Sequence, residues 1–123
     1  MKQIVIIATV GILLLPITEI VAARKVTIPT ATKENIEKGK QLAFENSKGN
    51  CLACHMMDNG EMPGNLGPPL IQMKQRFPKR SVLRAQIWDA TAINPQSVMP
   101  PFGKHGILTD EEVDRVVDYM YSL

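Results

Sequence analysis

The stretch Cys51-Leu52-Ala53-Cys54-His55 decides the fold of this chain, and it holds both of its cysteines. Two thiols separated by two residues can each form a thioether with one vinyl group of a haem, and the next residue then lies over the porphyrin face. In that position the Nε2 atom of His55 can coordinate the iron. The motif therefore predicts one covalently bound haem c, attached through Cys51 and Cys54, with His55 as an axial ligand.

Three other interpretations of the motif were weighed: a redox disulfide, a structural disulfide and a zinc site. A redox-active CxxC pair belongs with βαβ patterning, which the sequence lacks. A zinc site would need Cys51, Cys54, His55 and His105, but a cysteine and a histidine that are adjacent in sequence are poorly placed to share one tetrahedron. Haem attachment is the interpretation we favour.

The composition agrees with a small domain built around a cofactor. The chain has 123 residues and a formal charge of +2. Hydrophobic residues make up 45% of the chain, but aromatic residues make up only 5% of it. The charge is too small for a nucleic-acid-binding protein, and the length is too short for a Rossmann or barrel enzyme. A haem would supply the large flat apolar group that such a core lacks.

The N-terminus has the pattern of a secretory signal peptide. Met1-Lys2 supplies a positive charge, the run from Ile4 to Leu15 is uncharged, and Val21-Ala22-Ala23 offers small residues at the usual cleavage spacing. The apolar run is shorter than the ~20 residues that span a bilayer, so an uncleaved anchor is the weaker alternative. A periplasmic protein with no membrane span after cleavage is expected. The expected division is a signal peptide over residues 1–23, an extended arm over 24–34 and a cytochrome c domain over 35–123.

No strand-like alternation occurs, and three to four helices are expected. They cover residues 32–47, 71–76, 81–94 and a C-terminal segment that begins after Thr109. Thr32 and Ser81 are the expected N-caps, and Thr109 with Glu112 forms a capping box. The apolar faces of the last two helices are expected to contain Leu83, Ile87, Ala90, Val113, Val116, Val117 and Met120. Long Gly/Pro-rich loops separate these helices, so the sequence predicts an all-α fold with long loops around one covalently bound haem.

A haem iron held by His55 needs a partner on its other face. Met99 is the expected second axial ligand, because it precedes Pro100-Pro101 in a rigid loop that can present a thioether. His105 is the main rival and would give bis-histidine ligation. Further methionine candidates are Met57, Met62 and Met73.

The segment Gly67-Pro68-Pro69-Leu70 is expected to lie beside the proximal histidine. The carbonyl of Pro68 could accept a hydrogen bond from Nδ1–H of His55, which would fix the ring and tune its basicity. A plain rigid turn is the simpler interpretation, and the two are compatible.

A basic cluster flanks Phe77-Pro78. It could steer an acidic partner towards the haem edge, although such a run is more often a solvated face. This basic cluster consists of Lys74, Arg76, Lys79, Arg80 and Arg84.

Trp88, the only tryptophan, is expected on a core face or in the haem wall.

Several blocks together resemble the SoxX cytochromes, a branch of the class I cytochromes c. The blocks are residues 49–55, 64–70, 84–90, 94–95 and 99–105, and the resemblance runs from about Ile36 to Leu123. One departure is that Gly39 is followed by Ala43 rather than by an aromatic residue, with Phe44 one position later. We therefore expect the crossing of the first helix with the last, near Met120 and Tyr121, to differ from that of many class I cytochromes.

The resemblance implies a periplasmic monohaem cytochrome with His/Met ligation, which maps to His55 and Met99. It implies a SoxA partner that carries a cysteine persulfide, in a complex that oxidatively couples thiosulfate to a cysteine of the SoxYZ carrier. The chain would then be the electron-accepting subunit of a heteromeric L-cysteine S-thiosulfotransferase, passing electrons to a downstream cytochrome. It would not be catalytic alone, because it has no cysteine beyond the haem pair. A free diffusible electron carrier and a haem-based sensor are the alternative functions.

Overall fold

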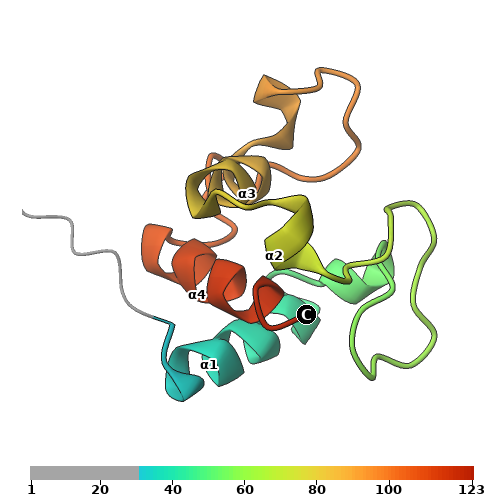
Figure 1. Ribbon diagram of the computed structural model, residues 1–123. Coiled ribbons are helices and arrows are strands. Elements are labelled where there is room, and N and C mark those ends of the chain that lie inside the picture. Colours follow the sequence, from blue (N-terminus) through green and yellow to red (C-terminus); the bar gives the residue numbers. More distant parts are fainter. Residues whose placement is uncertain (1–30) are drawn as a thin grey trace, which may run out of the picture.

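The computed structural model describes residues 31–123, and within that range the secondary structure is entirely helical. The α-helices are α1 (Lys33–Phe44), α2 (Met73–Arg76), α3 (Arg80–Trp88) and α4 (Asp110–Met120), and the short 3-10 helices are η1 (Cys51–Ala53) and η2 (Ala90–Ala92). Helix α4 lies centrally, with α1 on one side and α3 on the other, and two long loops extend on the same side of the molecule (Figure 1). This arrangement confirms the all-α prediction.

The expected signal peptide, residues 1–23, lies outside the described residues, as does most of the expected arm. Helix α1 already begins at Lys33, so the expected boundary between arm and domain falls inside its first turn. None of the helices in the described range is both long and apolar enough to cross a membrane.

The crossing of α1 with α4 depends on Gly39. A Cβ atom at this position would lie 2.0 Å from the carbonyl oxygen of Arg115 and 2.9 Å from Cβ of Tyr119, so only glycine permits the approach. The rings of Phe44 and Tyr119 pack with their centroids 6.4 Å apart. The contact therefore lies at Arg115 and Tyr119, on the N-terminal side of the expected Met120, and Phe44 contributes the aromatic ring of α1.

Two of the three expected N-caps are present. The Thr32 side chain accepts a hydrogen bond from the Asn35 amide at 3.1 Å. Thr109 and Glu112 form the reciprocal capping box, with a distance of 2.8 Å from the Thr109 amide to the Glu112 carboxylate. These caps confirm where the first and last helices begin.

The expected cap at Ser81 is wrong, and so is the expected extent of that helix to residue 94. Helix α3 begins at Arg80 and ends at Trp88, and Lys79 occupies the N-cap position without a side-chain cap. Arg80 forms an ion pair with Asp118 of α4 at 2.9 Å, which holds the start of α3 against α4. At the other end, Asp89 accepts from the Thr91 amide and so starts η2.

The first two helices are also shorter than expected. Helix α1 ends at Phe44 instead of Ser47, because the Gly49 amide donates back to the Leu42 carbonyl at 3.0 Å and turns the chain. Helix α2 keeps only Met73–Arg76 of the expected segment 71–76. These differences leave the number and order of the helices unchanged.

The buried core is formed by the faces that the sequence indicated. All seven apolar residues expected on the last two helical faces are buried: Leu83, Ile87, Ala90, Val113, Val116, Val117 and Met120. Ala43 of α1 and Leu70 of the loop after the CxxCH motif are among the other buried apolar residues. The core therefore packs α4 between α1 and α3, and it extends to the loop beside the motif.

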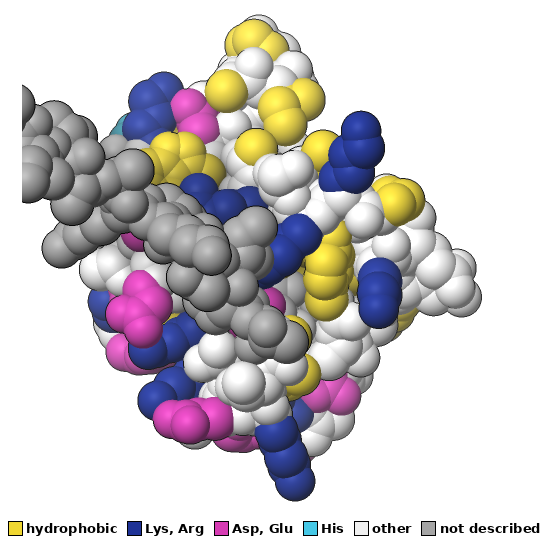
Figure 2. Space-filling view, turned by 60° about the vertical axis from the view of Figure 1, so that its left-hand side comes forward, with side chains coloured by type: hydrophobic (Ala, Val, Ile, Leu, Met, Phe, Trp, Pro, Cys, Tyr) yellow, Lys and Arg dark blue, Asp and Glu magenta, His cyan; other side chains and the backbone are white. Residues whose placement is uncertain are grey.

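Much of the basic cluster is engaged inside the molecule. Arg80 pairs with Asp118, and Arg84 pairs with Asp114 at 3.0 Å, so two of the five cations are balanced by α4. Figure 2 shows Lys and Arg side chains spread over one face, several of them beside Asp or Glu, without merging into a single patch. This distribution favours a solvated face over a dedicated docking patch.

Trp88 lies at the end of α3. The guanidinium of Arg84 lies over its ring at 5.2 Å from the centroid, and Gly103 packs against the ring edge. Trp88 packs against the core but is not among the residues that line the large pocket. Of the two expected positions, the structure supports the core face.

Candidate haem-binding site

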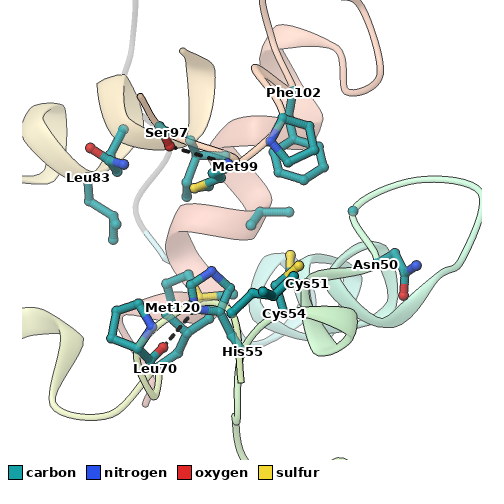
Figure 3. A pocket seen from close by; sticks show the side chains of 18 of the residues that line it. Asn50, Cys51, Cys54, His55, Leu70, Leu83, Ser97, Met99, Phe102 and Met120 are labelled. Carbon is teal, nitrogen blue, oxygen red and sulfur yellow. Dashed lines mark hydrogen bonds between the residues drawn. The ribbon is translucent and has the colours of Figure 1, made fainter. Parts of the chain in front are cut away.

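A pocket of about 680 Å³ lies between the CxxCH motif and the loop that precedes α4. Its volume falls in the range of about 300–1,000 Å³ that is typical of cofactor sites. The lining is mainly apolar and includes Leu70, Met73, Leu83, Ile87, Phe102 and Met120. Figure 3 shows the side chains of several of these residues pointing into this space.

Both cysteines of the motif are at the edge of this pocket. The 3-10 helix η1 begins at Cys51 after Asn50, whose positive φ of 42° turns the chain into the motif. The His55 amide donates to the Cys51 carbonyl at 2.9 Å, which closes the motif into a tight turn. In Figure 3 the sulfur atoms of Cys51 and Cys54 lie close together at one side of the pocket.

The Cys51 thiol does not have the character of a redox nucleophile. Both cysteines are free thiols, and burial raises the pKa of Cys51 to about 12. A redox-active CxxC motif depends on a lowered thiol pKa, because the thiolate is the nucleophile. A Cys51 thiol that stays protonated at neutral pH argues against the redox-disulfide interpretation.

His55 is held in place by the loop that follows the motif. Its Nδ1 atom lies 2.7 Å from the carbonyl oxygen of Pro68, the residue expected to accept this bond. If Nδ1 carries the proton, Nε2 is left free to coordinate a metal. The geometry thus presents the correct nitrogen of His55 to the pocket.

Gly67 permits this contact, a role that is not among those expected from the sequence. A Cβ atom at Gly67 would lie 2.1–2.7 Å from three atoms of the His55 ring. The Gly67 amide also donates to the Cys54 carbonyl at 2.8 Å. The glycine immediately before Pro68 was the available signal, since a close approach of backbone to a ring requires a residue without a side chain.

Further hydrogen bonds fix this loop on the motif. The Gly64 amide donates to Leu52 at 2.9 Å, and the Leu70 amide donates to Met56 at 2.8 Å. Arg76 donates through Nη1 to the Pro69 carbonyl at 2.6 Å. The sequence indicates Arg76 only as a member of the basic cluster, because a contact between α2 and the loop depends on tertiary packing.

Met99 lies across the pocket from His55. Figure 3 shows Met99 on the side of the loop before α4 and His55 on the opposite side, with the pocket between them. Met120 also lines the pocket but lies on the His55 side in this view. Met99 therefore has the position that a ligand opposite His55 requires.

The rival ligands are less well placed. His105 is exposed and does not line the pocket. Met57 is buried in the core away from the pocket lining, and Met62 is 94% exposed. Met73 lines the pocket, but its sulfur accepts a hydrogen bond from Arg76 at 3.4 Å.

The donor set that faces the pocket fits a haem. It consists of two thiols at one edge, an imidazole on one side and a thioether on the other, in an apolar surround. Within residues 31–123, no group of three or more His, Cys, Asp and Glu side chains is arranged to hold a metal ion. His105 does not line the pocket that holds Cys51 and Cys54. The zinc site considered from the sequence therefore has no fourth ligand in this arrangement.

Comparisons with known proteins identify the family of this chain. Residues 34–120 match the family described as cytochrome c oxidase, cbb3-type, subunit III. A chain of the crystal structure of SoxXA from P. pantotrophus superimposes with a TM-score of 0.65 and 26% sequence identity, covering 72% of this chain and 80% of that one.

A curated relative is an uncharacterized lipoprotein of Aquifex aeolicus (strain VF5). It is 36% identical over 76 residues, which is 61% of this chain and 37% of the relative. The chain thus spans well under half the length of that protein. The family match covers most of the chain, including the motif, the pocket and both long loops, and it implies haem c as the cofactor and electron transfer as the role. The chain belongs to the cytochrome family of cbb3-type oxidase subunit III, and it is similar to the SoxX cytochromes.

Proposed function

We propose that this chain is a periplasmic monohaem cytochrome c that serves as the electron-transfer subunit of a SoxAX-like complex. Cys51 and Cys54 would hold one haem through two thioethers, and His55 and Met99 would bind its iron. The observation that carries the proposal is the placement of His55 and Met99 on opposite sides of an apolar pocket whose edge holds both thiols.

The bound haem supplies an iron that takes up and releases one electron. His55 is oriented for coordination by its contact with the Pro68 carbonyl, which also raises the electron density on the ring. The Met99 thioether would favour the reduced iron and would keep exogenous ligands away from it. The apolar lining excludes water, so the site is suited to electron transfer and not to substrate binding.

The partner and substrate class are inferred from the SoxXA similarity and from the sequence blocks shared with SoxX cytochromes. The chain has two cysteines, and both are used for haem attachment in this proposal. A sulfur-carrying cysteine must then belong to a SoxA-like partner, and the thiosulfate-derived group would be passed to a SoxYZ-like carrier. The oxidative coupling of thiosulfate to a cysteine of the carrier releases electrons. This chain would take up these electrons and pass them to a downstream cytochrome.

The test is reconstitution with the partner. The holoprotein is coexpressed with a SoxA-type cytochrome from the same source, and the pair is purified through a tag on one chain. A stable heterodimer whose haem is reduced on addition of thiosulfate and SoxYZ-type carrier is expected. A monomer that never co-purifies, but is reduced by other redox proteins, would instead support the free diffusible carrier.

The proposed location is tested on the mature N-terminus. Expression of the full chain in a bacterium that attaches haem c in its periplasm should yield a protein beginning at Arg24, as read by mass spectrometry. A holoprotein that retains residues 1–23 would contradict cleavage and support an uncleaved anchor.

A further inference from the structure

The loop that carries Met99 is closed at its base by an ion pair. Asp89 directly follows α3, and the Lys104 ammonium group lies 2.7 Å from its Oδ2 atom, 15 residues later in the chain. Asp89 is only 8% exposed. The carbonyl of Trp88 accepts hydrogen bonds from the Gly103 and Lys104 amides, both at 3.2 Å, so backbone contacts reinforce the same junction.

The same carboxylate orders the start of the loop. The Oδ1 atom of Asp89 accepts from the Thr91 amide at 3.1 Å and from the Thr91 hydroxyl. At the other end of the loop, a Cβ atom at Gly103 would lie 2.0 Å from the Trp88 ring, so the backbone rests directly on the indole. Asp89 thus links both ends of the loop through its two oxygens.

The part of the loop that precedes Met99 makes few buried contacts, although Phe102, three residues after Met99, lies in the core. Residues 92–96 are all exposed, and Val98, next to Met99, is 77% exposed. Met99 itself is anchored locally by its amide, which donates to the Ser97 hydroxyl at 3.2 Å within the same loop. Because such a segment opens at a lower free energy than the core, its position depends on how firmly its ends are held.

We propose that the Asp89–Lys104 ion pair is a positioning device for Met99, which keeps the loop closed and the thioether in place across the pocket from His55. Breaking the pair opens the loop locally and exposes the sixth position of the iron while the helices stay folded. This inference rests on the proposed function, in which Met99 is the axial ligand.

The test compares three holoprotein variants. Lys104→Met removes the ion pair but leaves the Asp89 bond to Thr91, and Lys104→Arg restores the positive charge. Lys40→Met is the matched control, because it breaks the 2.6 Å ion pair to Asp58, which lies outside the Met99 loop. The readouts are the rate of carbon monoxide binding to the reduced protein, the far-red band of the oxidised protein and the far-UV circular dichroism.

Lys104→Met is expected to bind carbon monoxide about fivefold faster than wild type and to show a weaker far-red band, with unchanged helix content. Lys104→Arg should stay within about twofold of wild type, as should Lys40→Met. A Lys104→Met variant that behaves like Lys40→Met would overturn the inference, and so would a Lys104→Arg variant that behaves like Lys104→Met. A wild-type protein without a far-red band would overturn the Met99 assignment as well, and this failure is visible before any variant is compared.

Discussion

At the scale of single residues, the site depends on the side chains of His55 and Met99 and on the absence of a side chain at Gly67. His55 has its Nδ1 atom 2.7 Å from Pro68, and Gly67 leaves room for the ring. Met99 faces His55 from a separate loop. The ring is thus held by backbone and not by a neighbouring side chain, so substitutions at Gly67 act on it directly.

Gly67→Ala should displace the His55 ring, because the new Cβ would lie within 2.1–2.7 Å of its atoms. We expect a loss of about 1–3 kcal/mol in the free energy of unfolding together with an altered haem spectrum. Gly106→Ala is the control. At Gly106, φ is +67° and no atom lies within 4 Å of an added Cβ, so only backbone strain of about 1–2 kcal/mol is expected, with a normal spectrum. Equal spectra for the two variants would contradict the role of Gly67.

Met99→Ala should open the sixth position of the iron. The reduced variant is expected to bind carbon monoxide readily and the oxidised variant to lose its far-red band, because no thioether then faces His55. Met62→Ala, at a methionine that is 94% exposed, should leave both properties unchanged. An unaltered spectrum in Met99→Ala would mean that another residue is the ligand.

At the scale of elements, the crossing of α1 and α4 sets the position of the core. The Gly39 backbone rests on the Arg115 carbonyl, and the capping box of Thr109 fixes the start of α4. The motif begins a few residues after α1, so this crossing also determines where Cys51 lies relative to α4. A shift of one helix on the other would therefore move one wall of the pocket.

Gly39→Ala should destabilise the protein although alanine is the better helix former. The added Cβ would lie 2.0 Å from the Arg115 carbonyl oxygen, and a backbone atom cannot yield as a side chain can. A net loss of about 1–3 kcal/mol in the free energy of unfolding is expected from chemical denaturation. Gln41→Ala, at an exposed position of α1, should change it by less than about 0.5 kcal/mol. A stabilised Gly39→Ala variant would show that the helices are not in contact there.

At the scale of the whole molecule, ion pairs link segments that are far apart in the chain. Lys40 pairs with Asp58, Lys48 pairs with Glu112, and Lys104 pairs with Asp89. The Lys40 hydrogen bond lowers the pKa of Asp58, and the bonds from the Thr109 amide and then from Lys48 lower the pKa of Glu112. The Lys104 and Thr91 hydrogen bonds lower the pKa of Asp89 from 3.8 to about 2. Burial instead raises the pKa of Asp118, despite the nearby Arg80.

The stability of the fold should therefore fall in acid. A carboxylate whose pKa is lowered in the folded state stabilises the fold above its unfolded pKa, and this contribution is lost as the pH falls through the folded pKa. For Asp89 the loss should occur between pH 3.8 and about 2. Asp89→Asn should make the decline in denaturation midpoint over this window shallower, whereas Glu37→Gln, an exposed position on α1, should not. A wild-type decline that Asp89→Asn leaves unchanged would contradict this assignment.

The sequence was sufficient to predict the features that depend on local chemistry. The motif at Cys51, the N-cap at Thr32, the capping box of Thr109 and the apolar face of α4 all follow from residue type and spacing, and the fold class follows from them. The length of α3 did not follow, because Asp89 turns the chain by binding Thr91 and Lys104, and the latter is a tertiary contact. The role of Gly67 and the Asp89–Lys104 pair depend likewise on where two loops lie in space.

The central claim is that one haem c is held by Cys51, Cys54, His55 and Met99. The most direct test is the visible spectrum of the purified protein, made with its own N-terminus in a host that attaches haem c, in both oxidation states. We predict sharp reduced bands, a weak far-red band in the oxidised form and haem that stays with the chain on denaturation. A low-spin spectrum without the far-red band would contradict Met99 as the ligand, and a protein without haem would contradict the account as a whole.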